Sequence, residues 1–127
     1  MTDLNLSVLN KIFEESGDIL FAYLFGSCAR GDAFPSSDID LAVYLTQKEV
    51  SFDEKLALHS RLSRALKTDS LDLTILNETK NLMLLEEIVR YGRVICDKNP
   101  SRRETFESGI LHDAIDFKYQ RRLFAGV

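Results

Sequence analysis

A Gly-Ser turn and two nearby aspartates are the residues of this chain whose spacing best suits chemistry on a phosphate group. Gly26-Ser27 ends the apolar run 19–25, and Asp38 and Asp40 precede a second apolar run. A glycine has no Cβ and lets a phosphate approach the backbone, while the amides of a following helix and a serine hydroxyl donate to it. Residues two apart in an extended segment project to the same face, so the two carboxylates are expected to lie together.

Asp72 is a third candidate, because it interrupts the otherwise apolar segment 71–76. If that segment is a strand paired with residues 40–45, all three carboxylates can meet. Carboxylate oxygens suit magnesium rather than zinc. Two ions about 3.5–4 Å apart would serve the attacking and leaving oxygens of an in-line displacement. Plainer interpretations stay open at this point: Asp38 caps a turn, Asp40 begins a solvated strand, and Asp72 lies on a solvated edge strand.

Size and composition favour one domain, residues 1–127, in a cytoplasmic and reduced setting. The chain has 127 residues and a net charge of −4, which disfavours a general nucleic-acid binder, so no direct sequence-specific nucleic-acid contact is expected. No apolar stretch is long enough for a membrane span, and the first residues lack a signal-peptide layout. Cys28 and Cys96 make neither a disulfide framework nor a zinc site.

The hydrophobic pattern predicts an alternation of helices and strands. Helices are expected over residues 3–16, 52–67, 79–91 and 101–124, with a short one over 27–31, and strands over 18–25, 41–45, 71–76 and 93–96. The short link between the first two strands suits an antiparallel pair, whereas helical links favour parallel neighbours. We therefore expect an α+β (α/β-like) fold, with a small mixed sheet of about four strands flanked by helices.

The last helix, about residues 100–127, is expected to contact a partner. One apolar stripe is predicted on it, formed by Phe106, Ile110, Ala114 and Phe117 and widened by Leu111 and Ile115. Its cations are interpreted as a solvated face, with a contact surface for an acidic partner or RNA as the alternative; they are Arg102, Arg103, Lys118, Arg121 and Arg122. His59 and His112 are interpreted as surface histidines.

The central motif resembles that of a known enzyme superfamily. Gly26-Ser27-Cys28-Ala29-Arg30-Gly31-Asp32, followed by Ser37-Asp38-Ile39-Asp40-Leu41, resembles the signature of DNA-polymerase-β-like nucleotidyltransferases, and in particular of the minimal, MNT-type members. The resemblance implies a polymerase β-like fold with a long C-terminal helix and a site that takes ATP and two Mg²⁺ ions. It also extends to Asp72 and to the closing strand 92–95.

The resemblance also implies roles for single residues. Gly26 and Ser27 would hold the β- and γ-phosphates, and Asp38 and Asp40 would coordinate both magnesium ions. Asp72 would complete the site of the metal that activates the acceptor hydroxyl. Arg30 would lie near the phosphates, although a surface arginine paired with Asp32 is an equal alternative.

The acceptor is expected to arrive on another protein. After Cys96 only about thirty residues remain, mostly one helix, which leaves no room for an acceptor-binding domain. MNT proteins that resemble this chain act as antitoxins that transfer AMP from ATP to a tyrosine of a HEPN-type ribonuclease toxin. The resemblance therefore implies such an antitoxin. Two alternatives remain: an antitoxin that acts only by steric covering, and a stand-alone enzyme that adenylylates a small hydroxyl compound.

Overall fold

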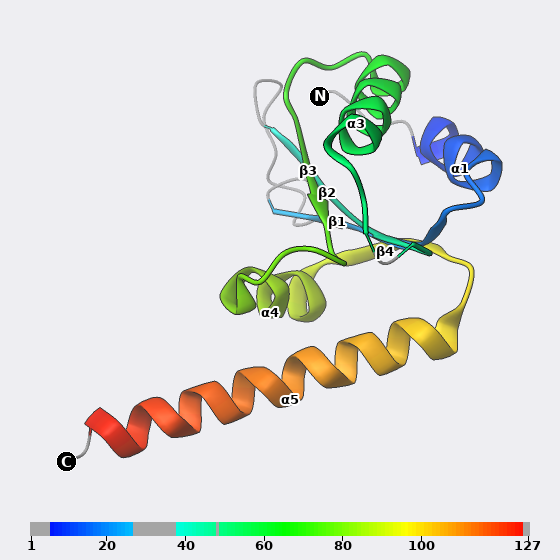
Figure 1. Cartoon of the computed structure of the whole chain (residues 1–127). Coiled ribbons are helices and arrows are strands. Elements are labelled where there is room, and N and C mark those ends of the chain that lie inside the picture. Colours follow the sequence, from blue (N-terminus) through cyan, green and yellow to red (C-terminus); the bar gives the residue numbers. More distant parts are fainter. Residues whose placement is uncertain (1–5, 27–37, 48, 126–127) are drawn as a thin grey trace.

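A four-stranded mixed sheet forms the centre of the molecule (Figure 1). The computed structural model describes residues 6–26, 38–47 and 49–125. The strand order is β3-β2-β1-β4; β1 pairs antiparallel with β2 and β4, and β2 pairs parallel with β3. The strands are β1 (Ile19–Phe25), β2 (Ile39–Leu45), β3 (Leu71–Ile75) and β4 (Arg93–Asp97). The expected mixed sheet is therefore confirmed, and β2 begins two residues earlier than expected.

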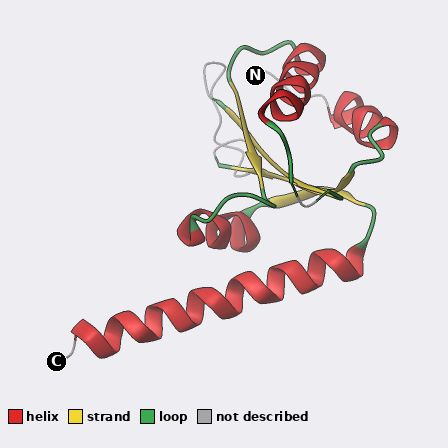
Figure 2. Ribbon diagram, viewed as in Figure 1, coloured by secondary structure: helices red, strands yellow, loops and turns green. Residues whose placement is uncertain are grey.

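Helices cover both faces of this sheet (Figure 2). Helices α1 and α3 pack on one face, where Phe13 and Leu62 lie in the core, while α4 packs on the other face through Leu85 and Ile88. The helices are α1 (Leu6–Glu15), α3 (Phe52–Leu66), α4 (Leu82–Tyr91) and α5 (Pro100–Ala125). The α+β class and the long C-terminal helix are confirmed. The short helix expected over 27–31 lies outside the described residues.

Strand β1 is buried on both faces because its side chains alternate between the two cores. Ala22 and Leu24 join the core under α1 and α3, whereas Phe21, Tyr23 and Phe25 join the core under α4. The sequence of such a strand is a continuous apolar run, which is why the sequence pattern identifies it.

Within the described residues, no helix combines the length and the apolar character that crossing a membrane requires.

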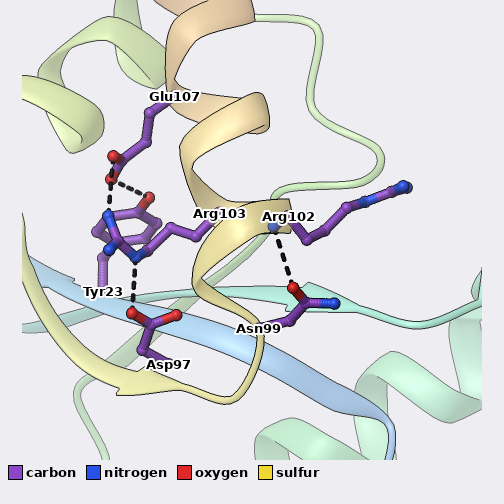
Figure 3. A network of polar contacts seen from close by, with 6 residues as sticks. All are labelled: Tyr23, Asp97, Asn99, Arg102, Arg103 and Glu107. Atoms are coloured by element: carbon purple, nitrogen blue, oxygen red, sulfur yellow. Dashed lines mark hydrogen bonds and ion pairs between the residues drawn. The ribbon is translucent and has the colours of Figure 1, made fainter.

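A network of polar contacts attaches the start of α5 to the sheet (Figure 3). The Tyr23 hydroxyl donates to Glu107 at 2.7 Å, and Arg103 donates to Glu107 at 2.9 Å and to Asp97 at 3.0 Å. Burial raises the pKa of the Tyr23 phenol, and its hydrogen bond to Glu107 raises that pKa further, so the group stays a donor. The interpretation of the α5 cations as a solvated face is therefore wrong for Arg103.

Tyr23→Phe is expected to destabilise the fold by about 1 kcal/mol, because it removes a partly buried hydrogen bond without opening a cavity. Urea unfolding of the full chain measures the loss. Tyr44→Phe is the matched control, because the hydroxyl of Tyr44 meets Arg102 at an exposed position and should contribute less. Equal losses in the two variants would contradict the role given to the Tyr23 network.

The single apolar stripe expected on α5 is only partly correct. Ala114 is buried and Phe106 and Ile110 pack against the core, but Ile115 is 59% exposed and Phe117 46%. In Figure 1 the distal part of α5 extends past the sheet, and among the described elements α4 lies beside it, so the distal apolar side chains have no sheet core to pack against. The contact between the two helices includes the ion pair of Lys118 with Glu86 at 2.8 Å.

Candidate active site

The candidate residues meet at one end of the sheet, where β1 stops and β2 and β3 start. In the antiparallel β1–β2 pair Phe25 lies opposite Asp40, and in the parallel β2–β3 pair Asp40 lies beside Asp72. The Gly26 turn therefore lies next to Asp40, with Asp72 on the neighbouring strand. Asp38 precedes β2, on the face that Asp40 shares. The expected pairing of the Asp72 strand with the Asp40 strand is confirmed.

Gly26 makes a close approach that only glycine allows. Its φ of 74° lies in the left-handed region, which L residues with a Cβ rarely adopt. A Cβ built at this position would collide with Oδ2 of Asp40. The bare Cα of Gly26 thus lies directly against the Asp40 carboxylate, and the backbone after β1 can come near a group bound there.

Asp40 and Asp72 are neighbouring carboxyl groups on adjacent parallel strands. Burial raises the pKa of Asp40, and the nearby charges of Asp72 and Asp38 and a side-chain hydrogen bond with Asp72 raise it further. Like charges this close disfavour the ionised form of Asp40, and a cation bound beside it would remove that cost. This is the electrostatic signature of a cation or proton-transfer site, and it depends on three of the aspartates that the sequence singles out.

The donor set fits a hard divalent cation. The carboxyl groups at this end of the sheet offer only oxygen atoms, the ligands that magnesium prefers. Within the described residues, no three carboxyl, histidine or cysteine side chains are arranged so that they could hold a metal ion as they stand. The geometry therefore places Asp40 beside Asp72, and the charge of Asp38 is close enough to raise the pKa of Asp40.

The raised pKa of Asp40 predicts a pH dependence of stability in metal-free protein. The folded state binds more protons than the unfolded chain, so the free energy of unfolding falls as pH rises from the ordinary value of 3.8 through the raised pKa. Asp40→Asn has no carboxyl group to ionise, so it does not lose stability as pH rises. At pH values above the raised pKa we therefore expect the variant to have a higher melting temperature than wild type. This difference in melting temperature should shrink as the pH is lowered toward 3.8. Thermal unfolding with chelator at several pH values checks this, and exposed Asp69→Asn is the control. An advantage that stays constant across pH would contradict it.

Two other predicted residues, Ser27 and Arg30, lie outside the described residues, and their roles stay predictions.

His59 is half-buried; its Nε2 donates to the carbonyl oxygen of Leu71 at 2.9 Å, so the surface interpretation is wrong for it. That interpretation holds for His112, whose side chain is 75% exposed.

Glu87 is a residue that the sequence analysis did not single out. It lies on α4, and its charge is a minor contribution to the raised pKa of Asp40, which places it within electrostatic range of Asp40. The sequence signal was an acidic residue on the polar side of a predicted helix. Acidic residues of this kind are common on helices. The proximity of Glu87 to Asp40 becomes visible only when the packing of α4 on the sheet is known.

Comparison with known proteins identifies the class. The family model described as "Polymerase beta, Nucleotidyltransferase" matches residues 8–101. The match covers most of the chain, so the chain belongs to this nucleotidyltransferase family. The expected superfamily and class of activity are therefore confirmed.

Solved structures share the whole fold. A toxin–antitoxin structure with AMP-PNP is 22% identical with a TM-score of 0.81, covering 97% of each chain. A complex of a tri-AMPylated Shewanella oneidensis HEPN toxin with MNT antitoxin is 21% identical with a TM-score of 0.74, covering 99% of this chain and 97% of that one. An MntA–HepT toxin–antitoxin structure is 21% identical with a TM-score of 0.73, covering 98% and 97%. No curated protein matches the chain.

Proposed function

We propose that this chain transfers AMP from ATP, with magnesium, to a hydroxyl of a partner HEPN-type ribonuclease toxin, a tyrosine in the leading hypothesis, and so acts as its antitoxin. The observation that carries the proposal is the Asp40–Asp72 pair beside Gly26, in a chain that belongs to the nucleotidyltransferase family. We further infer a single domain over residues 1–127 in the cytoplasm.

The residues at the end of the sheet supply the parts that the reaction needs. Gly26 lets the phosphates come against the backbone, where Ser27 and Arg30 would add donors. Asp40 and Asp72, with Asp38, would hold the magnesium ions. Bound magnesium would neutralise phosphate charge and lower the pKa of the acceptor hydroxyl.

The transfer itself is a displacement at the α-phosphorus of ATP. The acceptor oxygen forms a bond to this phosphorus, the bond to the β-phosphate oxygen breaks, and pyrophosphate leaves. The proton of the acceptor hydroxyl passes to a carboxylate oxygen. Asp72 suits this step because its side chain is exposed while it lies beside the half-buried Asp40.

Support for the partner comes from the structures of the same fold. One neighbour is a HEPN toxin complex whose toxin is tri-AMPylated, and another contains AMP-PNP, an analogue of ATP. The identity of 21–22% establishes the fold alone, so the acceptor and the nucleotide of this chain belong to the proposal.

The test mixes this protein, magnesium and ATP with the purified product of the adjacent reading frame, and measures the intact mass of that product. The expected result is a gain of one or more AMP masses. The double variant Asp38→Asn/Asp40→Asn should abolish the gain. No gain, with full neutralisation of the toxin by the double variant, would establish steric action instead. Transfer only to a small hydroxyl compound such as an aminoglycoside would favour the stand-alone enzyme.

A further inference from the structure

Strand β3 is the last strand on one side of the sheet formed by the described residues, with β2 as its neighbour. Ile39 lies beside Leu71 in this parallel pair, and its N–H donates to the carbonyl oxygen of Ser70 at 2.8 Å. In a parallel ladder the residue beside Ile39 directs its own N–H and C=O away from β2. The carbonyl of Leu71 therefore points to the open edge of the sheet and needs a donor from another element.

His59 supplies this donor from helix α3. Its Nε2 lies 2.9 Å from the carbonyl oxygen of Leu71, and because a carbonyl only accepts, Nε2 carries the proton. In the neutral ring Nδ1 is then an acceptor, and the hydroxyl of Ser63, one helical turn further along α3, lies 3.4 Å from it. The half-buried imidazole is thus oriented by a contact at each ring nitrogen.

The peptide group that His59 holds is the one that leads into Asp72. The carbonyl of Leu71 and the N–H of Asp72 belong to one planar peptide group, so the direction of one fixes the other. Leu71 packs into the core under α1 and α3, and side chains alternate along a strand, so Asp72 projects from the opposite face, beside Asp40. The hydrogen bond from α3 therefore acts on Asp72 through the backbone, from the face that the carboxylates do not use.

We propose that His59 is a positioning residue for Asp72: it fixes the peptide plane between Leu71 and Asp72 and so keeps the Asp72 carboxylate in the orientation that transfer requires. The inference rests on the proposed function, because it assumes that Asp72 holds magnesium and takes the acceptor proton. His59 acts from the other face of the strand and touches neither nucleotide nor acceptor. Since Gly26 and Asp40 stay in place without it, its loss should lower kcat more than it weakens ATP binding.

The test compares three variants of the full chain. His59→Leu removes the donor at similar volume, and His59→Gln restores an N–H donor at a similar reach. Asn77→Ala is the matched control, because Asn77 holds the opposite end of β2 through the N–H and the carbonyl of Leu45, both at 2.8 Å. For each variant, kcat and the KM for ATP are measured with the product of the adjacent reading frame, and amide hydrogen exchange of Asp72 is measured without metal or nucleotide.

His59→Leu is expected to lower kcat by about 30-fold, as the loss of an orienting partner behind a metal ligand does, with the KM for ATP within about threefold of wild type. Exchange of the Asp72 amide should become about fivefold faster, because a hydrogen bond that holds its peptide group is lost. His59→Gln should recover most of both properties. Asn77→Ala should keep kcat and the Asp72 exchange rate within about twofold of wild type, although it loses stability.

Unchanged kcat in His59→Leu, while wild type transfers AMP, would overturn the positioning role and leave the proposed function standing. An equal loss of kcat in Asn77→Ala would also overturn it, because His59 would then act only through general stability. Absence of transfer by wild type would refute the proposed function itself. In that case faster exchange of Asp72 in His59→Leu alone would still support the contact between α3 and β3 as the restraint on Asp72, and unchanged exchange would overturn it.

Discussion

Asp40→Asn is expected to lower the rate of AMP transfer by about a thousandfold while the fold stays intact. Asp40 lies between Gly26 and Asp72, and its pKa is raised by burial and by two neighbouring carboxylates. An amide cannot replace the negative charge that would hold magnesium against the triphosphate, and the loss of such transition-state stabilisation costs factors of this order. Single-turnover transfer to the partner at saturating ATP measures the effect.

Asp69→Asn is the control for this experiment, because Asp69 is an exposed aspartate on the loop before β3, near the same end of the sheet. Its transfer rate should match that of wild type. The Asp40→Asn variant should still show one cooperative thermal unfolding transition. If Asp40→Asn keeps a rate within tenfold of wild type, the carboxyl pair is not the centre of the chemistry.

Gly26→Ala should lower transfer by about a hundredfold and destabilise the protein by about 1–2 kcal/mol. The left-handed backbone costs about that much for a residue with a Cβ. The new methyl group would also meet Oδ2 of Asp40, so the carboxylate must move or the turn must open. A displacement of this size in a positioning element is sufficient for the expected loss of rate.

Gly17→Ala is the matched control, because a Cβ at Gly17 meets nothing within 4 Å and the glycine is exposed. It should leave both transfer and stability close to wild type. Thermal unfolding and the transfer assay on the same samples separate the two effects. Wild-type transfer by Gly26→Ala would show that the close approach of the turn to Asp40 has no part in the reaction.

Most of the fold is predictable from sequence because its strands are strongly apolar and its turns carry glycine. The β1 run is bounded by Gly17 and Gly26, and α3 begins at the capping box of Ser51 and Glu54. The pairing of Asp40 with Asp72 follows from a parallel β2–β3 connection through a helix, which the alternation of elements already favours. These features depend on local sequence or on elements that follow one another in the chain, so they can be predicted from a single sequence.

Other parts depend on packing between distant segments. The role of Arg103 in holding α5 depends on Tyr23, eighty residues earlier in the chain, and no local pattern reveals that contact. The position of Glu87 near Asp40 likewise requires the placement of α4 on the sheet. The α5 stripe was overestimated because its spacing is helical throughout, while only its first half has the sheet core to pack against.

We propose that the nucleotide and its metal bind at the end of the sheet, between Gly26, Asp40 and Asp72. The most direct measurement adds Mn²⁺, a paramagnetic substitute for magnesium, to isotope-labelled protein with a non-hydrolysable ATP analogue and records amide NMR signals. The amides of Gly26, Asp40 and Asp72 are predicted to broaden first, and Asp40→Asn should remove the effect. Broadening centred on another part of the chain, such as the His59 end of α3, or unchanged signals at these three residues, would contradict the account.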